Sequence, residues 1–125
     1  MCNLQELIQA TIPHDSTLCV VGTVEPARVI LRLTGPLDLE SSRALQNLLV
    51  ELSESCHRGL DVVIDLFNVD YISSTGVGAL TSGMAAIRKH DAMMTLRGIQ
   101  PKVRAVLELL GILSFFREEV DGQTH

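Results

Sequence analysis

The sequence has few aromatic residues and no recognisable cysteine pattern. Aromatic residues make up 3% of its 125 residues, and tryptophan is absent. Hydrophobic residues nevertheless reach 46%, so we expect a core built from leucine, valine, isoleucine and alanine. The cysteines, Cys2, Cys19 and Cys56, are odd in number and form no C-x-x-C pair. This pattern argues against a disulfide framework or a zinc site and fits a reducing cytosol.

The chain also lacks an excess of basic charge. Its 10 Lys and Arg residues stand against 15 Asp and Glu residues, for a net charge of −5. This balance argues against nucleic acid or an anionic membrane as the main partner. The first 20 residues contain no lysine or arginine, which argues against a signal peptide. No apolar run approaches the ~20 residues that cross a bilayer, so we expect a cytoplasmic protein without membrane insertion.

Signatures of enzyme sites are missing as well. The sequence contains no G-x-S-x-G elbow and no Walker motif, and the run at 76–81 lacks the last glycine of the dinucleotide fingerprint. The histidines are placed in polar loops or at helix ends, far in sequence from Ser73 and Ser74, so no base for a catalytic serine is expected. No spacing of His, Cys and carboxylates suggests a metal. We therefore expect a protein that is not an enzyme and needs no cofactor.

The sequence does contain alternating strand and helix patterns. They predict strands at 17–24, 28–34, 61–66, 93–97 and 115–120, and helices at 41–56, 76–89 and 101–110. Glu25-Pro26 predicts the turn of a hairpin between the first two strands. The continuous apolar run at 61–66 is typical of a buried parallel strand. This order predicts an α/β fold with a mixed, mostly parallel sheet of four or five strands and helices packed on it.

The ends of the chain are less informative. Residues 3–6 fit a capping box at the start of a short helix that Pro13 would end. The alternative for residues 1–16 is a loose arm. We expect one domain at 17–121 and a tail at 122–125.

The stretch at 70–80, DYISSTGVGAL, places three hydroxyl side chains where the chain leaves a strand and enters a helix. They belong to Ser73, Ser74 and Thr75. The first N–H groups of a helix have no partner within it, and Ser and Thr side chains satisfy them. The same position favours anions, because the free N–H groups and the helix dipole both attract negative charge. Two compatible interpretations follow: an N-cap, and a hydroxyl presented for phosphorylation.

The helix predicted at 76–89 contains two glycines, Gly78 and Gly83. Glycine inside a helix costs about 1 kcal/mol relative to alanine. Something is therefore expected to pack closely against this helix, either another helix or a partner. Its core stripe is expected to consist of Val77, Leu80, Met84 and Ile87.

From about residue 28 to 120 the chain resembles the STAS domain family, of the anti-sigma factor antagonist type. The segment at 35–38, GPLD, is similar to the family's strand-end motif before the first long helix. The segment at 70–78 is similar to its phosphoacceptor loop. The segments at 98–103 and 110–112 are similar to its last strand-to-helix connection and helix exit. The resemblance implies the STAS fold.

The resemblance also implies a switching mechanism. The unphosphorylated protein would bind a serine kinase of the GHKL type that doubles as an anti-sigma factor, phosphorylation would end this binding, and a PP2C-type phosphatase would restore it. Matched to the family pattern Asp-Ser-Ser/Thr-Gly, Ser74 is the phosphoacceptor, followed by Thr75 and Gly76. Ser73 stands in place of the usual aspartate, which removes a negative charge beside the acceptor.

A surface for the partner is expected around the acceptor. Asp38 and Ser74 both follow strand ends in parallel connections, so we expect them at the same end of the sheet. Ser74 is expected to be exposed, and Asp38 to cap its helix or orient the loop. We assign to the partner-docking surface Asp38, Val77, Gly78 and Ser82.

An alternative of another class remains open at this point. The chain would then be a STAS accessory subunit of a membrane transport complex or of a signalling scaffold. The same surface would dock a protein, and phosphorylation would be irrelevant. A neighbouring gene for a GHKL-type kinase or a PP2C-type phosphatase would favour the switch, whereas a permease or ATPase gene would favour the accessory subunit.

Overall fold

The structure, a computed structural model, describes residues 3–55 and 57–119 and has an α/β fold, as the sequence predicted. Its elements in chain order are α1 (Leu4–Thr11), β1 (Cys19–Val24), β2 (Arg28–Thr34), α2 (Leu39–Glu54), β3 (Asp61–Asn68), α3 (Ser74–Arg88), β4 (Met94–Arg97), α4 (Pro101–Leu109), a 3₁₀ turn η1 (Leu113–Phe115) and β5 (Arg117–Glu119).

The strands form one sheet of five strands in the order β1-β2-β3-β4-β5. The first pair, β1 and β2, is antiparallel, and the remaining pairs are parallel. The predicted hairpin is confirmed: Val24 pairs with Val29, and the Glu25 N–H donates to the Arg28 carbonyl at 2.8 Å. Because β2, β3 and β4 run parallel, the loops that follow their carboxyl ends lie at one edge of the sheet.

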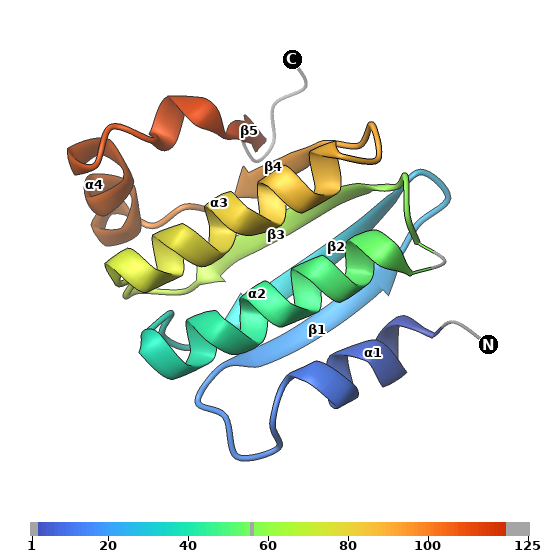
Figure 1. Cartoon of the computed structure of the whole chain (residues 1–125). Coiled ribbons are helices and arrows are strands. Elements are labelled where there is room, and N and C mark those ends of the chain that lie inside the picture. The colour runs from blue at the N-terminus through green and yellow to red at the C-terminus, as the bar shows by residue number, and fades with distance from the viewer. Residues whose placement is uncertain (1–2, 56, 120–125) are drawn as a thin grey trace.

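The helices α1, α2 and α3 lie side by side across one face of the sheet (Figure 1). Their apolar stripes and the inward positions of the strands form one aliphatic core, to which α4 contributes Val103 and Leu107. The leucines that repeat at helical spacing along α2 are all buried there: Leu45, Leu48, Leu49 and Leu52. The aliphatic core that the scarcity of aromatic residues predicted is therefore observed.

Close contact between α2 and α3 explains one of the two helical glycines. A Cβ atom at Gly83 would collide with the side chain of Leu49, so the small residue lets the two helices approach. At Gly78 an added Cβ would meet nothing within 4 Å. Internal packing therefore accounts for Gly83 but not for Gly78.

The N-terminal segment forms the short helix rather than the loose arm. Asn3 caps α1, because its side-chain oxygen accepts hydrogen bonds from the N–H groups of Gln5 at 2.8 Å and Glu6 at 3.3 Å. Leu4 and Ile8 are buried.

Several predicted boundaries were off by one or more residues; α3, for example, begins at Ser74 rather than at residue 76. The first long helix begins at Leu39 rather than at residue 41, because Asp38 is its N-cap. The last strand was predicted at 115–120, but Phe115 belongs to η1, where its N–H donates to the Ile112 carbonyl at 3.0 Å, and β5 spans Arg117–Glu119. The expectations for Cys56, Val120 and the tail fall outside the described residues.

Candidate functional site

The segments that precede α2 and α3 are joined at one edge of the sheet. Leu37 and Ile72 form an isolated parallel bridge. The Leu37 N–H donates to the Tyr71 carbonyl, and the Ser73 N–H donates to the Leu37 carbonyl, both at 2.9 Å. Asp38 and Ser74, which follow these residues directly, therefore lie at the same end of the sheet, as the parallel topology predicted.

Ser73 is the N-cap of α3. Its hydroxyl oxygen accepts from the Gly76 N–H at 3.1 Å and lies 3.0 Å from the Leu37 carbonyl oxygen and 2.6 Å from the Thr75 hydroxyl. A carbonyl oxygen only accepts, so the single Ser73 proton goes to Leu37. The Thr75 hydroxyl must then donate to Ser73. The serine that replaces the usual aspartate thus caps the helix and also ties it to the preceding strand end.

Ser74 differs from both of its neighbours. It is the first residue of α3, it is exposed, and its hydroxyl makes no hydrogen bond with any described residue. Of the three consecutive hydroxyls, Ser73 and Thr75 are engaged with each other, and Ser74 projects unbound at a helix N-terminus. An exposed hydroxyl without a partner among the described residues can be reached by another molecule from outside.

The first turn of α3 packs so closely against Ile72 and Leu37 that only glycine fits at position 76. A Cβ atom there would lie 2.7 Å from Ile72 Cγ1 and 2.9 Å from the Leu37 carbonyl oxygen, much closer than real side chains approach. The glycine therefore lets the first turn of α3 rest on the joined strand ends.

Asp38 caps α2 in the same way that Ser73 caps α3. Its Oδ1 accepts from the Ser41 N–H at 3.0 Å, and its own N–H donates to the Ser41 hydroxyl at 3.0 Å. The single proton of that hydroxyl is shared between Asp38 Oδ1 at 2.9 Å and the Pro36 carbonyl at 2.8 Å. These hydrogen bonds, the backbone one first, hold the pKa of Asp38 below its ordinary value. Asp38 is thus a charged cap at physiological pH, and the predicted capping role is correct.

A groove of about 310 Å³ runs between α2 and α3 beside these caps. It is lined by Leu39, Ser42, Arg43, Gln46, Thr75, Gly78 and Ser82. Two residues predicted for the docking surface, Gly78 and Ser82, therefore lie together in the groove. Val77 does not: it is 7% exposed and belongs to the core, so its assignment to the docking surface is corrected.

Sequence reasoning missed the α2 side of this groove. The spacing of Leu39, Arg43 and Gln46 places them on one side of α2. From the sequence alone, Arg43 was interpreted as an ordinary charge that faces solvent. Tyr71, next to the acceptor loop, is 53% exposed and was also not predicted as a contact.

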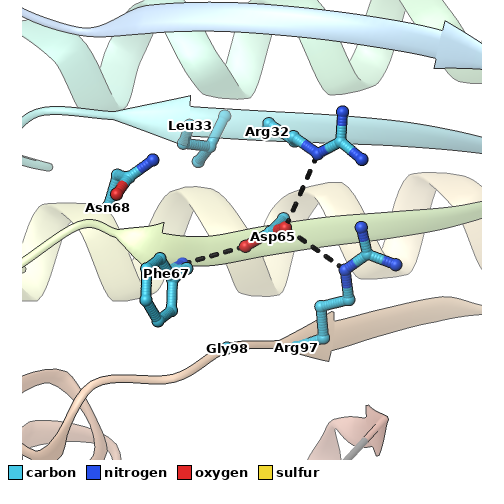
Figure 2. Close-up of a pocket in the computed structure, with 7 residues that line it drawn as sticks. All are labelled: Arg32, Leu33, Asp65, Phe67, Asn68, Arg97 and Gly98. Atoms are coloured by element: carbon cyan, nitrogen blue, oxygen red, sulfur yellow. Dashed lines mark hydrogen bonds and ion pairs between the residues drawn. The ribbon is translucent and has the colours of Figure 1, made fainter. Parts of the chain in front are cut away.

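A second hollow, of about 390 Å³, lies on the sheet face away from the helices (Figure 2). In it Asp65 of β3 pairs with Arg97 of β4 at 3.2 Å and with Arg32 of β2 at 3.8 Å, and it accepts from the Phe67 N–H at 2.9 Å. Asp65 thus connects three strands, and Arg97 also pairs with Glu119 of β5 at 3.4 Å. These ion pairs link neighbouring strands of the sheet.

The described part of the chain contains no group of His, Cys, Asp or Glu side chains arranged to hold a metal ion. Among the helices of residues 3–55 and 57–119, none is long and apolar enough to cross a membrane.

Comparison with known proteins identifies the family of this chain. A family model described as "STAS domain" matches residues 16–123, so the chain belongs to the STAS domain family. Within this family, the chain is similar to proteins named anti-sigma factor antagonists. The anti-sigma-B factor antagonist of Staphylococcus aureus is 24% identical over 82 residues, which are 66% of this chain and 74% of that protein.

Solved structures show the same fold. An anti-sigma factor antagonist from Mycobacterium paratuberculosis superposes with a TM-score of 0.70 at 18% identity, over 86% of this chain and 88% of that one. The Bacillus cell fate determinant SpoIIAA in its phosphorylated form gives a TM-score of 0.59 at 19% identity, over 82% of this chain and 93% of that one.

Proposed function

We propose that this chain is an anti-sigma factor antagonist that works by partner switching, with Ser74 as its phosphoacceptor. In the cytoplasm, the unphosphorylated chain binds a GHKL-type serine kinase that is also an anti-sigma factor, and the sigma factor is released. The kinase phosphorylates Ser74, the complex dissociates, and a PP2C-type phosphatase restores the binding form. The relatives named anti-sigma-B factor antagonist and the phosphorylated form of SpoIIAA support this proposal.

The observation that carries it is the free, exposed Ser74 hydroxyl between two engaged hydroxyls. A phosphoryl group there sits at the N-terminus of α3, where unpaired N–H groups and the helix dipole favour an anion by ~0.3–1 kcal/mol. The fold therefore tolerates the modification.

The charge of the phosphoryl group, which the fold tolerates, is unfavourable in an interface with a partner. Phosphorylation adds about −1.5 to −2 charges at pH 7. A desolvated, unpaired charge in a docked surface costs roughly 2–5 kcal/mol. Because each 1.4 kcal/mol corresponds to a tenfold change in affinity, phosphorylation weakens partner binding by ~30-fold or more.

The proposed docking surface surrounds Ser74. It includes Asp38, Gly78 and Ser82 from the sequence analysis. Leu39 and Tyr71 add apolar contact area, because they are 64% and 53% exposed. Exposed apolar side chains beside a modifiable hydroxyl suit a protein partner better than a small-molecule ligand.

The test is phosphorylation by the GHKL-type serine kinases of the same genome in the presence of ATP. Mass spectrometry is expected to place the phosphate on Ser74, and Ser74→Ala is expected to abolish it. Ser114→Ala removes an exposed hydroxyl elsewhere and serves as the matched control. Phosphate on another residue, or none with any of these kinases, would contradict the proposal.

The accessory-subunit alternative makes a different prediction for the affinity of the chain for its partner. A docking subunit would keep its partner whether or not Ser74 carries a phosphate, so equal affinities before and after phosphorylation would favour the alternative.

A further inference from the structure

The groove between α2 and α3 contains a single unbalanced charge. Arg43 is the one charged residue among the described residues that line it. Arg43 is exposed, and within residues 3–55 and 57–119 no carboxylate forms an ion pair with it, not even Glu40 of the preceding turn. In a chain with a net charge of −5, this places an isolated positive group beside the proposed acceptor loop.

A buried hydroxyl in the same groove also lacks a partner. Ser42 is 2% exposed, and its Oγ atom forms no hydrogen bond with any described residue. Buried polar groups are normally hydrogen-bonded, so an orphaned hydroxyl on a groove wall points to a group that arrives from outside. Arg43 and Ser42 are both donors, and a guanidinium cannot accept. Because Arg43 can only donate, an occupant that satisfies both side chains must be an acceptor, to which the Ser42 hydroxyl can also donate.

Gly78 keeps the groove open without helping the fold. An added Cβ would meet nothing within 4 Å, so no neighbour in this chain requires a glycine there. A helical glycine that packing does not require fits a groove kept clear for another molecule.

We propose that this groove receives an Asp or Glu side chain of the kinase, with Arg43 as its counter-charge and Ser42 as a second donor. The inference rests on the partner-switching function proposed above and names the chemistry of the partner's contact. It also supplies a reason for release: Ser74 adjoins Thr75 of the groove wall, so a phosphoryl group there repels the incoming carboxylate and competes with it for Arg43.

The test measures the affinity of the unphosphorylated chain for its kinase by titration calorimetry. Arg43→Glu is expected to weaken binding ~30-fold or more, as for a charge pair that has lost one partner. Arg58→Glu makes the same charge change at an exposed position beyond the far end of α2 and is expected to leave affinity within about twofold. Circular dichroism checks that both variants fold.

The partner's carboxylate is then found by charge exchange. Each exposed Asp or Glu of the kinase is replaced in turn by Arg, and each kinase variant is titrated with Arg43→Glu. One of these variants is expected to bind Arg43→Glu at least tenfold more tightly than the unchanged kinase does. Gly78→Ala is an independent probe, expected to keep the fold but weaken binding because its methyl group fills the groove.

The outcomes separate the two proposals. If the wild-type chain binds its kinase but Arg43→Glu binds as well as Arg58→Glu, or if no exchange restores affinity, the groove inference is wrong and the proposed function stands. If the wild-type chain binds no kinase, both fail.

Discussion

The hydroxyl of Ser73 donates to the carbonyl of Leu37 across 3.0 Å, although the two residues are 36 positions apart in the chain. Together with the Ser73 N–H bond to the same carbonyl, it fastens the start of α3 to the strand end that precedes α2. The position of the proposed acceptor therefore depends on both connections.

Removing the cap is expected to destabilise the protein. Ser73→Ala loses the N-cap bond to Gly76, and the free energy of unfolding should fall by about 0.5–2 kcal/mol. Ser73→Asp still accepts from the Gly76 N–H and the Thr75 hydroxyl, so it should lose less than Ser73→Ala. Urea denaturation measures both, and a Ser73→Ala variant as stable as wild type would show that the cap contributes nothing.

Two glycines of the same helix are expected to respond in opposite directions. Gly76→Ala forces a methyl group against Ile72 and the Leu37 carbonyl, and such overpacking typically costs 1–3 kcal/mol. Gly78→Ala meets open space and gains about 1 kcal/mol of helix propensity. Thermal unfolding of the two variants, each compared with wild type, should show one midpoint lowered and the other raised.

A negative charge on Ser74 is expected to affect binding and spare the fold. Ser74→Glu places a carboxylate at the first position of α3, where the helix dipole favours it by ~0.3–1 kcal/mol, so the unfolding midpoint should stay the same or rise slightly. Affinity for the kinase should fall, though less than with phosphate, because a carboxylate carries less charge. Ser74→Ala should bind like the unphosphorylated wild type. A large loss of stability in Ser74→Glu would contradict the surface role of this residue.

Acid is expected to remove part of the stability through Asp38. Its pKa in the folded protein lies below the ordinary value of 3.8, because the Ser41 N–H and hydroxyl bind the ionised form. A depressed pKa contributes stability at every pH above the ordinary value, and this contribution is lost as pH falls through the folded value. Below about pH 4, the free energy of unfolding should therefore fall more steeply for wild type than for Asp38→Asn. Asp15→Asn, at an exposed loop position, should follow wild type.

Much of the fold follows from local pattern. The leucines of α2 repeat at helical spacing, the residues of β2 alternate between the two faces, and Glu25-Pro26 breaks the chain between strands, so element types and order were predictable. The start of α2 was placed two residues late because the repeating apolar positions of the helix begin only at Leu45, and the observed bonds show that Asp38 directly precedes the helix. The start of β5 was missed because a 3₁₀ turn leaves little periodic signal.

The site was predictable only in part. The hydroxyls at 73–75 are typical of a helix N-terminus, and the parallel topology places Asp38 at the same edge of the sheet. Val77 was expected both in the core stripe of this helix and on the docking surface, and the packing of the helix places it in the core. The pairing of Arg43 with this groove depends on how α2 and α3 pack, which no single segment encodes.

The bonds that fasten Leu37 to Tyr71 and Ser73 also determine what kind of substrate the acceptor loop is. A short peptide with the sequence of residues 70–80 lacks Leu37, so nothing holds its backbone, and each residue must be ordered on binding at about 1–2 kcal/mol. In the folded chain, the bonds to Leu37 already order the backbone of this loop before the kinase binds. Under the proposed function, the kinase therefore recognises a three-dimensional surface rather than a linear motif, and a protein carrying the same eleven letters in an unstructured tail would escape it.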